Sequence, residues 1–156
     1  MIATRALLHP CTLLAIALLI VNDHILKSAA PGVVTGKLSD FAGLAFFPLL
    51  LAAAAELVGV RRGMKAIVIA TIATGIVFAA IKLSASAGEV YRVGLAVLQW
   101  PVRALRALVD GRAVPGLGRV SLVRDPTDLV ALVALAIPVL IARRIDHRTR
   151  DGTVEG

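Results

Sequence analysis

Two shortages in the sequence, of charged residues and of cysteine, restrict the class of protein. Asp, Glu, Lys and Arg make up 17% of the 156 residues and hydrophobic residues make up 58%, whereas a soluble domain carries about 25% charged and 45–50% apolar residues. The single cysteine, Cys11, excludes an intrachain disulfide and provides no spacing for a metal cluster. These shortages predict an integral membrane protein that holds no metal and needs no cofactor.

The motifs of common enzymes are also absent. The sequence contains no serine–histidine–acid order, HExxH, CxxC or dinucleotide-binding fingerprint, and Thr35-Gly36-Lys37 lacks the spacing of a phosphate-binding loop. The formal net charge is +7, but the basic residues lie beside apolar runs and form no patch with interleaved aromatics. This pattern predicts contact with the phospholipid bilayer, mainly with anionic lipids, and no nucleic-acid partner.

Four apolar runs predict four membrane-spanning helices. The runs are short, about 14–20 residues against the ~20 needed to cross a bilayer, so polar residues must enter the helix ends at membrane depth. A signal peptide is the rival interpretation of the first run, but Lys27 and Pro31 fit a cleavage site poorly. We predict an all-α membrane protein, a four-transmembrane-helix bundle in one domain (1–145), with spans at about 8–27, 40–60, 65–84 and 127–144 and a disordered polar tail at 146–156.

The segment between the third and fourth spans predicts a basic amphipathic helix at about 90–110. Its apolar residues recur every three or four positions, and an arginine-rich stripe lies beside them. We expect this helix to lie in the membrane interface and to break at Pro101. The apolar set is Tyr91, Leu95, Leu98, Val102, Leu105 and Val109, and the polar stripe is Arg92, Gln99, Arg103, Arg106 and Asp110.

Basic residues next to the predicted spans indicate the orientation of the chain. Arg61, Arg62 and Lys65 lie in the tight linker between spans two and three, and Arg143 and Arg144 follow span four. Cytoplasmic loops of membrane proteins are enriched in Lys and Arg. The pattern therefore predicts a multi-pass protein of the bacterial cytoplasmic membrane with both termini in the cytoplasm.

An up-and-down order of four spans gathers polar residues from distant parts of the chain at one membrane face. An ionised side chain at membrane depth costs a few kcal/mol unless it is paired or hydrated. Asp23 and Lys27 have the spacing of a helical ion pair, and Asp23 is adjacent to His24, which could handle a proton near neutral pH. His24 and Asp23 are therefore weak catalytic candidates. The ligand-binding candidates are Lys27, Lys37, Asp40, Lys82, Arg124, Asp125 and Asp128.

Helix caps and local ion pairs offer a purely structural explanation for the same residues. Asp125-Pro-Thr-Asp128 matches the first positions of a helix, with Asp125 at the N-cap, and Ser39-Asp40 resembles another helix start. Thr35-Gly36-Lys37 is expected to form a mobile loop. Glu56, near residues 61–62, is expected to form an ion pair that reaches toward the membrane surface.

Three strings mark the predicted helix ends: Asn22-Asp-His-x-x-Lys27, Thr35-Gly-Lys-Leu-Ser-Asp-Phe-Ala-Gly43 and Asp125-Pro-Thr-Asp-Leu129. They resemble a group of small bacterial multi-pass membrane proteins without an assigned function, over most of residues 9–142. The layout is also similar to that of VanZ-like membrane proteins, although Lys82 stands where that family has a glutamate–glutamine signature. The resemblance implies a link to the cell envelope or to glycopeptide-type resistance and names no reaction.

Three functions are compatible with these patterns. The first is binding of an anionic lipid headgroup or a lipid-linked phosphate, with the phosphate held by the cations. The second is a small transporter or proton-coupled carrier that works as a homo-oligomer, suggested by the ionisable groups and by Pro48 within the second span. The third is a structural or accessory membrane subunit that binds no ligand.

Overall fold

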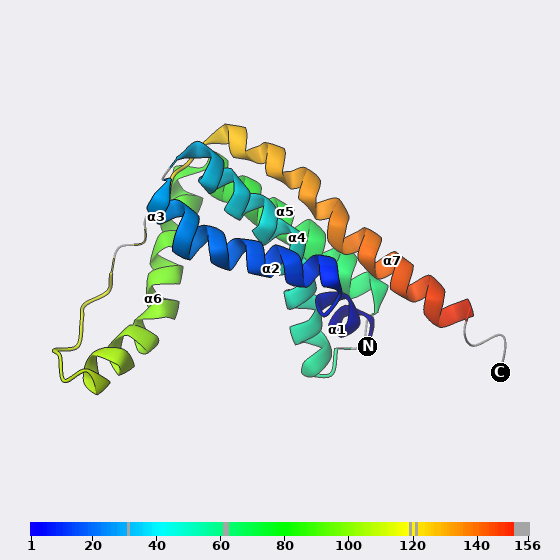
Figure 1. Ribbon diagram of the computed structural model, residues 1–156, viewed down its shortest axis with the longest axis horizontal. Helices are drawn as coiled ribbons and strands as arrows, with labels where there is room; N and C mark the ends of the chain where they lie inside the picture. The colour runs from blue at the N-terminus through cyan, green and yellow to red at the C-terminus, as the bar shows by residue number, and fades with distance from the viewer. Residues whose placement is uncertain (31, 61–62, 119, 121, 152–156) are drawn as a thin grey trace. The chain divides into compact units, whose positions relative to one another are not determined.

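The computed structural model consists of helices and describes residues 1–30, 32–60, 63–118, 120 and 122–151 (Figure 1). Helices make up 83% of the chain, and no strand occurs among the described residues. The predicted all-α class is therefore confirmed. The elements are α1 (Ile2–Leu7), α2 (Pro10–Val21), the π-helix η1 (Asn22–Leu26), α3 (Lys27–Ala29), α4 (Val33–Leu57), α5 (Met64–Leu83), α6 (Ala85–Val109), the 3₁₀-helix η2 (Pro126–Leu135) and α7 (Ala136–Asp151).

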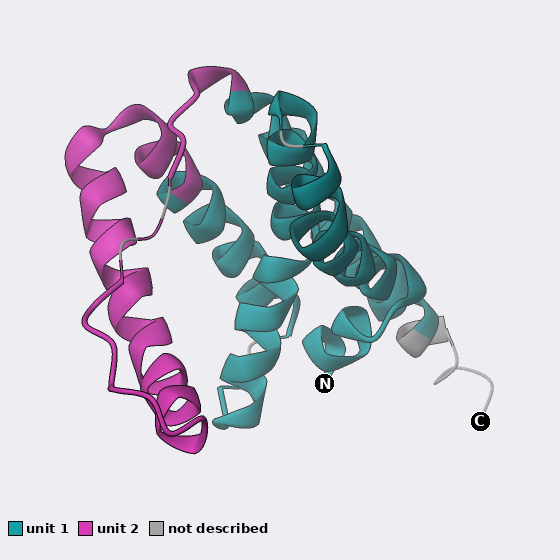
Figure 2. Cartoon of the chain, turned by 60° about the vertical axis from the view of Figure 1, so that its left-hand side comes forward, with its two compact units in different colours: residues 1–77, 128–156 teal, residues 78–127 magenta. Residues whose placement is uncertain are grey.

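The chain forms two compact units, which Figure 2 distinguishes by colour. Unit 1 comprises Met1–Val77 and Asp128–Gly156, and unit 2 comprises Phe78–Thr127. α1, α2, α4 and α7 belong to unit 1 and α6 belongs to unit 2, whereas α5 and η2 contain residues of both.

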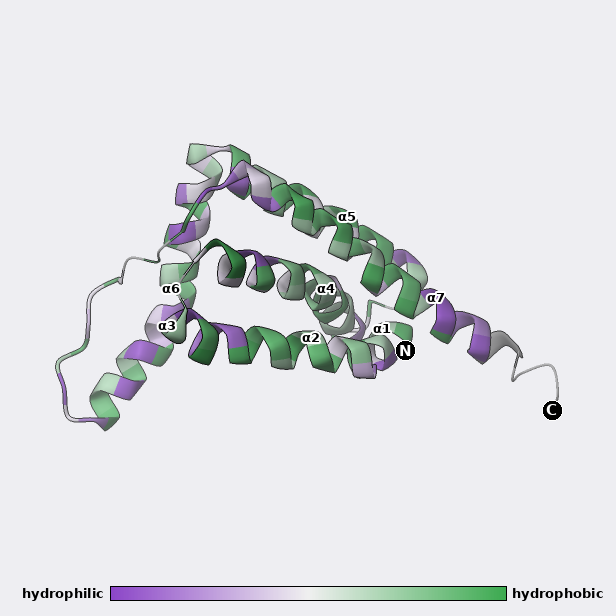
Figure 3. Cartoon of the chain, turned by 45° about the horizontal axis from the view of Figure 1, so that its top comes forward, coloured by the Kyte–Doolittle hydropathy of each residue, from purple (hydrophilic) through white to green (hydrophobic). Residues whose placement is uncertain are grey.

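Three helices are long and apolar enough to cross a membrane: Pro10–Ala29, Val33–Leu57 and Met64–Leu83. Their outer faces carry large aliphatic side chains; Leu14 is 69% exposed and Ile76 is 65% exposed. Figure 3 shows hydrophobic residues along most of α2 and hydrophilic residues in the last turns of α7. Such apolar outer faces on long helices are what a lipid environment requires. These helices characterise the chain as a membrane protein.

A short helix that the sequence does not predict, α1, is held in unit 1 by a buried carboxylate. Glu56, near the end of α4, is 5% exposed. Its Oε1 accepts a hydrogen bond from the Ala3 N–H at 3.1 Å, and its Oε2 accepts from the N–H and the hydroxyl of Thr4 at 3.1 and 3.0 Å. The first N–H groups of a helix have no partner within it, and a negative charge beside them is favourable. Glu56 therefore caps α1 from another helix.

Side chains also fix the junction between α1 and α2. The buried Thr12 donates its hydroxyl to the Ala6 carbonyl at 2.8 Å. His9 Nδ1 accepts a hydrogen bond from the Cys11 N–H at 3.3 Å, and Pro10 occupies the first turn of α2, where its missing N–H costs nothing. The residues ahead of the first span are thus part of the folded core.

Small residues let the helices of unit 1 approach closely. α1, α4, α5 and α7 meet in a cluster that is mostly alanine, and small residues are typical of close contacts between membrane helices. The cluster comprises Ala3, Ala6, Leu49, Ala52, Ala53, Ala66, Ile67, Ala70, Ile141 and Ala142.

Contacts along α5 show that it runs antiparallel to the last two elements of the chain. Ala66, near the start of α5, shares the core cluster with Ala142 of α7. Further along α5, a Cβ added to Gly75 would lie 2.8 Å from Leu135 Cδ1 and 3.8 Å from Leu132 Cδ2. Position 75 therefore accepts no side chain without movement of Leu135.

The second candidate span belongs to a helix that begins before residue 40, where the sequence predicts the span to start. α4 begins at Val33, so Thr35–Lys37 is helical and forms no loop, and Ser39-Asp40 lies inside the helix. The Thr35 hydroxyl accepts a hydrogen bond from the Gly32 N–H at 3.2 Å. This contact anchors the start of α4 about two turns earlier than the apolar run suggests.

The C-terminal part of the chain also differs from its prediction. The apolar run 129–142 is not one α-helix, because η2 continues to Leu135 and α7 begins at Ala136. The tail expected to be disordered is helical over 146–151, while 152–156 lies outside the described residues. The expected pairing of Glu56 with residues 61–62 also lies outside the described part of the chain.

In unit 2, the chain that follows α6 returns along its arginine-bearing side. The expected break at Pro101 is wrong, because α6 continues through this residue. Trp100 Nε1 donates to the Pro115 carbonyl at 2.9 Å, and Arg92 Nε donates to the Val120 carbonyl at 3.0 Å. The returning segment therefore runs antiparallel to α6 and uses its own main-chain carbonyls to bind polar side chains of the helix.

Replacement of Glu56 by alanine is expected to lower the melting temperature and to release α1. The change leaves the N–H groups of Ala3 and Thr4 without their acceptor, at a cost of about 3 kcal/mol. Thermal unfolding in detergent or nanodiscs measures the loss. Trypsin cleavage after the exposed Arg5, followed by mass spectrometry, measures the release of α1.

Glu89→Ala is the matched control for this experiment. The Glu89 side chain is 65% exposed and pairs with Arg92 at 2.7 Å, so its removal should change stability by less than about 0.5 kcal/mol. Unchanged melting and unchanged cleavage in Glu56→Ala would show that Glu56 does not hold α1.

Candidate functional site

Polar residues of unit 1 gather where the first turns of α4 lie between η1 and η2. Thr35 and Ser39, one turn apart on α4, contact η1, and Lys37 reaches the start of η2. The first half and the last part of the chain thus meet at α4. This set is termed the polar end and comprises Asn22, Asp23, His24, Lys27, Thr35, Lys37, Ser39, Asp40 and Asp128.

Asn22 joins η1 to α4. Its side chain is fully buried, and Nδ2 donates to the Thr35 carbonyl at 2.6 Å and to Ser39 Oγ at 2.7 Å. A carbonyl oxygen only accepts hydrogen bonds, so the contact with Thr35 assigns the NH₂ group to this side of the amide. The two helices are therefore joined through both donors of one amide.

The other atom of this amide has no partner. Asn22 Oδ1 is buried and accepts no hydrogen bond from the described residues. A buried acceptor without a donor costs about 1–3 kcal/mol, and such atoms in folded proteins are usually satisfied by water or a ligand. Asn22 also opens the π-helix η1, and π turns recur at functional sites. One further hydrogen-bond donor beside Oδ1 would satisfy this buried oxygen of the polar end.

A chain of hydrogen bonds leads from Asn22 to a more exposed ion pair. Ser39 Oγ accepts from Asn22 and donates to Asp23 Oδ1 at 2.7 Å. Lys27 Nζ lies 2.7 Å from the same carboxylate oxygen, and the two charged side chains are 41% and 40% exposed. The predicted Asp23–Lys27 pair is therefore confirmed. An ammonium group has three N–H donors, and Asp23 engages one of them.

The ring of His24 is bound to the main chain. His24 Nδ1 lies 3.0 Å from the Ile20 carbonyl, which can only accept, so Nδ1 carries the proton. In the neutral ring, Nε2 is then the acceptor. Asp23 is engaged by Ser39 and Lys27. The geometry thus leaves the Nε2 of an exposed histidine as the atom available for proton transfer.

A second ion pair joins α4 to η2. Lys37 Nζ lies 2.7 Å from Asp128 Oδ1, and the side chains are 26% and 10% exposed. The sequence spacing suggests Asp40 as the neighbour of Lys37, yet this contact spans 91 positions of the chain. Asp40 lies one turn further along α4 and is half-buried. The Lys37–Asp128 pair ties η2 to α4 within unit 1.

Three predicted ligand-binding residues lie in unit 2. Lys82 is 8% exposed, and its Nζ lies 5.3 Å from the centre of the Phe78 ring, a cation–π contact. Asp125 Oδ1 accepts from the Thr127 N–H at 2.9 Å, which is the predicted N-cap interaction. Arg124 precedes Asp125 in the segment that returns along α6. The contacts described for Lys82 and Asp125 are with residues of unit 2.

The residues that join η1 to α4 at the polar end are uncharged. The sequence pattern places Asn22 and Ser39 at this membrane face without showing their role, and it assigns Thr35 to a loop. The spacing of Thr35 and Ser39, four positions apart, is the signal that would have placed both on one helical face. Charge alone therefore does not identify the junction between η1 and α4.

No protein-family model matches this chain, and neither a curated protein nor a solved structure is significantly similar to it. The resemblance to small bacterial membrane proteins and to VanZ-like proteins remains a prediction. The chemistry of the polar end follows from its own geometry.

A double-mutant cycle on Lys37 and Asp128 tests the inner ion pair. Lys37→Met or Asp128→Leu removes one member of a poorly exposed ion pair, and each is expected to cost about 2 kcal/mol, less than for a fully buried pair. The double variant should recover part of this loss, with a coupling energy of about 1–2 kcal/mol. Unfolding in nanodiscs provides the four free energies.

The more exposed pair of the polar end is the control. Lys27→Met combined with Asp23→Asn removes an ion pair of the same 2.7 Å length, and its coupling should stay below about 1 kcal/mol. Additive effects of the Lys37 and Asp128 changes would mean that this pair does not hold η2 on α4.

Proposed function

We propose that this chain binds the phosphate of an anionic lipid headgroup, or of a lipid-linked phosphate, at the polar end of unit 1. The polar end lies where two candidate spans, Pro10–Ala29 and Val33–Leu57, end and begin. Lys27 is the main observation behind this proposal. Its half-exposed ammonium has N–H donors beyond the one engaged by Asp23, and the residue lies six positions before the start of α4.

The N-terminus of α4 adds main-chain donors beside Lys27. Val33 and Val34 lie in the first turn of α4, where N–H groups have no acceptor within the helix, and these residues are 66% and 79% exposed. Free N–H groups and the positive end of the helix dipole favour phosphate. The main chain would bind the phosphate oxygens from one side and Lys27 from the other.

The buried part of the network positions Lys27. Asn22 binds Ser39, Ser39 binds Asp23, and Asp23 binds Lys27. A lysine held in place before the ligand arrives loses less conformational entropy on binding. In this proposal Lys37, engaged by Asp128, joins α4 to η2 and Lys27 is the phosphate ligand.

η2 and the first half of α7 form the fourth span in this proposal. The apolar run 129–142 would extend only about 21 Å as an α-helix, short of the ~30 Å hydrocarbon core. A 3₁₀-helix rises ~2.0 Å per residue instead of 1.5 Å, which lengthens the same run to about 24 Å. The 3₁₀ winding of residues 129–135 therefore supports a crossing by a short run.

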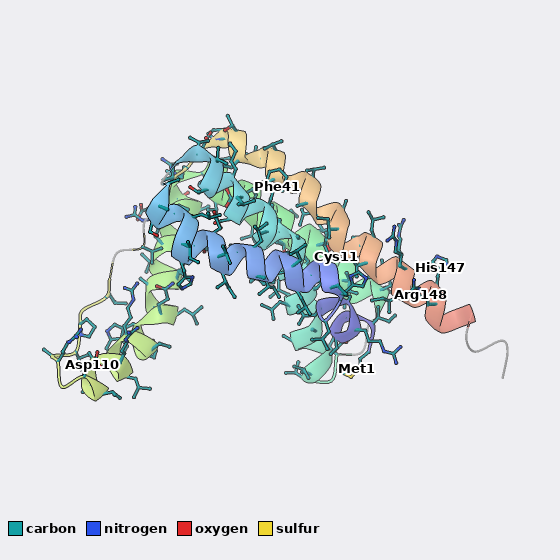
Figure 4. All side chains as sticks on the ribbon, in the orientation of Figure 1. Met1, Cys11, Phe41, Asp110, His147 and Arg148 are labelled. Carbon is teal, nitrogen blue, oxygen red and sulfur yellow. The ribbon has the colours of Figure 1, made fainter. Side chains whose placement is uncertain are left out.

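Four spans would place both termini at the end of unit 1 opposite the polar end. Figure 4 shows Met1 and Arg148 at this end, and the exposed Lys65 and Arg144 flank spans there. Since cytoplasmic faces are rich in Lys and Arg, this end faces the cytoplasm of a bacterial cell in our proposal. The polar end then faces the opposite side of the cytoplasmic membrane.

α6 lies in the membrane interface in the same proposal. It begins at Ala85, two positions after the candidate span α5 ends at Leu83, so the chain connection keeps it near the membrane surface. Val90 and Leu98 on its apolar side are 74% and 73% exposed. An exposed apolar face beside an arginine-bearing face is typical of interfacial helices.

A structural role without a ligand is the second candidate, favoured by the Lys37–Asp128 pair. These side chains contact each other directly at 2.7 Å, and a polar end closed by direct pairs needs no lipid phosphate. Under this alternative, lipids with different headgroups would give the same melting temperature.

Lys27→Gln is expected to weaken the binding of an anionic lipid about tenfold, because a hydrogen bond to a charged group contributes about 1.5 kcal/mol or more. Native mass spectrometry during titration with phosphatidylglycerol measures the bound fraction, and phosphatidylcholine gives the baseline. Lys65→Gln, which removes the same charge at the opposite end of unit 1, should bind like the wild type. Equal binding by all three proteins would refute the phosphate site and favour the structural role.

Single-cysteine variants test the orientation. In a Cys11→Ser background, Val34→Cys is expected to react with a membrane-impermeant maleimide on intact spheroplasts, because Val34 lies at the exposed polar end. Lys65→Cys should react only after permeabilisation. Labelling of both cysteines without permeabilisation would contradict the placement of residues 34 and 65 on opposite sides of the membrane.

A further inference from the structure

Unit 2 contains an apolar groove between α6 and the returning segment. The groove has a volume of ≈ 560 Å³ and is lined by Val97 and Trp100 of α6 and by residues 114–117. Trp100 is 39% exposed and Leu117 is 62% exposed. The hydrogen bond from Trp100 to the Pro115 carbonyl holds the two walls together. This volume lies within the range of small-molecule sites.

The described part of the returning segment contacts the polar side of α6, and apolar side chains on the other side of the helix stay exposed. Arg92 binds the Val120 carbonyl on the polar side. On the other side, Val93, Leu105 and Val109 are 60%, 64% and 78% exposed. The groove opens beside this apolar face, so an apolar occupant of the groove would continue onto an apolar surface.

Unit 2, which contains the groove, has a positive net charge. Unit 2 contains seven Lys and Arg residues against three Asp and Glu residues. Arg103 lies one turn after Trp100, and its guanidinium packs against Gly118, directly after the groove residue Leu117. One Arg103 N–H donates to Gln99 Oε1 at 2.9 Å, and a guanidinium has five N–H donors. A cation therefore flanks one end of an apolar groove.

We propose that this groove holds an acyl chain of an anionic phospholipid whose phosphate is bound by Arg103. An occupant of the groove must be apolar where it contacts the walls and negatively charged near Arg103. An anionic phospholipid of the leaflet in which α6 would lie meets both requirements. The inference rests on the interfacial placement of α6 proposed above. It is independent of the phosphate site at Lys27, which belongs to unit 1.

Trp100, the only tryptophan of the chain, is a native reporter of this site. The full-length protein is reconstituted in phosphatidylcholine vesicles that contain a small fraction of dibrominated phosphatidylglycerol or dibrominated phosphatidylcholine, because bromine quenches tryptophan only on contact. The brominated anionic lipid is expected to quench saturably and at about tenfold lower mole fraction, as expected for one charge-assisted contact.

Two variants and one control locate the effect. Arg103→Gln should abolish the preference for the anionic lipid, whereas Arg106→Gln, with the same charge change on the same helix, should retain it. Gly116→Leu should also reduce the preference, because a side chain at Gly116 meets no atom within 4 Å and would fill part of the groove.

Two results would overturn the inference in distinguishable ways. Equal quenching by both brominated lipids, unchanged by Arg103→Gln, would mean that α6 lies in the interface and that the groove has no lipid site. The absence of quenching by either lipid would reject both the groove site and the interfacial placement of α6.

Discussion

In lipid, a polar side chain must find its partner within the protein, and in unit 1 α4 provides such partners at both of its ends. Glu56 at one end of α4 binds the start of α1, and Thr35 and Ser39 at the other end bind Asn22. Lys37, close to Ser39, binds the beginning of η2. Alanine-rich surfaces bring the helices together without specifying their register. The polar contacts of α4 provide that register, so α4 positions both ends of unit 1.

The features that follow from local sequence patterns could be predicted. Long apolar runs identify Pro10–Ala29, α4 and α5 as helices able to cross a membrane, because a bilayer requires about twenty apolar residues whatever their order. The Asp23–Lys27 pair follows from helical spacing. Asp125 was correctly expected at an N-cap, since its hydrogen bond to the Thr127 N–H depends only on neighbouring residues.

The contacts that escape prediction have partners that residue type does not mark. Glu56 binds main-chain N–H groups of α1, and Asn22 binds the main-chain carbonyl of Thr35. Every residue carries such groups, so nothing in the sequence indicates which ones are used. The Lys37–Asp128 pair could not be predicted from the sequence for another reason. Its members are 91 positions apart, and Asp40 offers an acid much closer along the chain.

The 3₁₀ winding of η2 makes the position of Asp128 sensitive to small changes in helical geometry. If the ten residues of η2 relaxed to α-helical winding, the element would shorten by about 5 Å and Asp128 would rotate by about 160° relative to α7. Such a screw motion would carry the carboxylate to the far side of the helix from Lys37. The ion pair with Lys37 therefore depends on the 3₁₀ winding of η2.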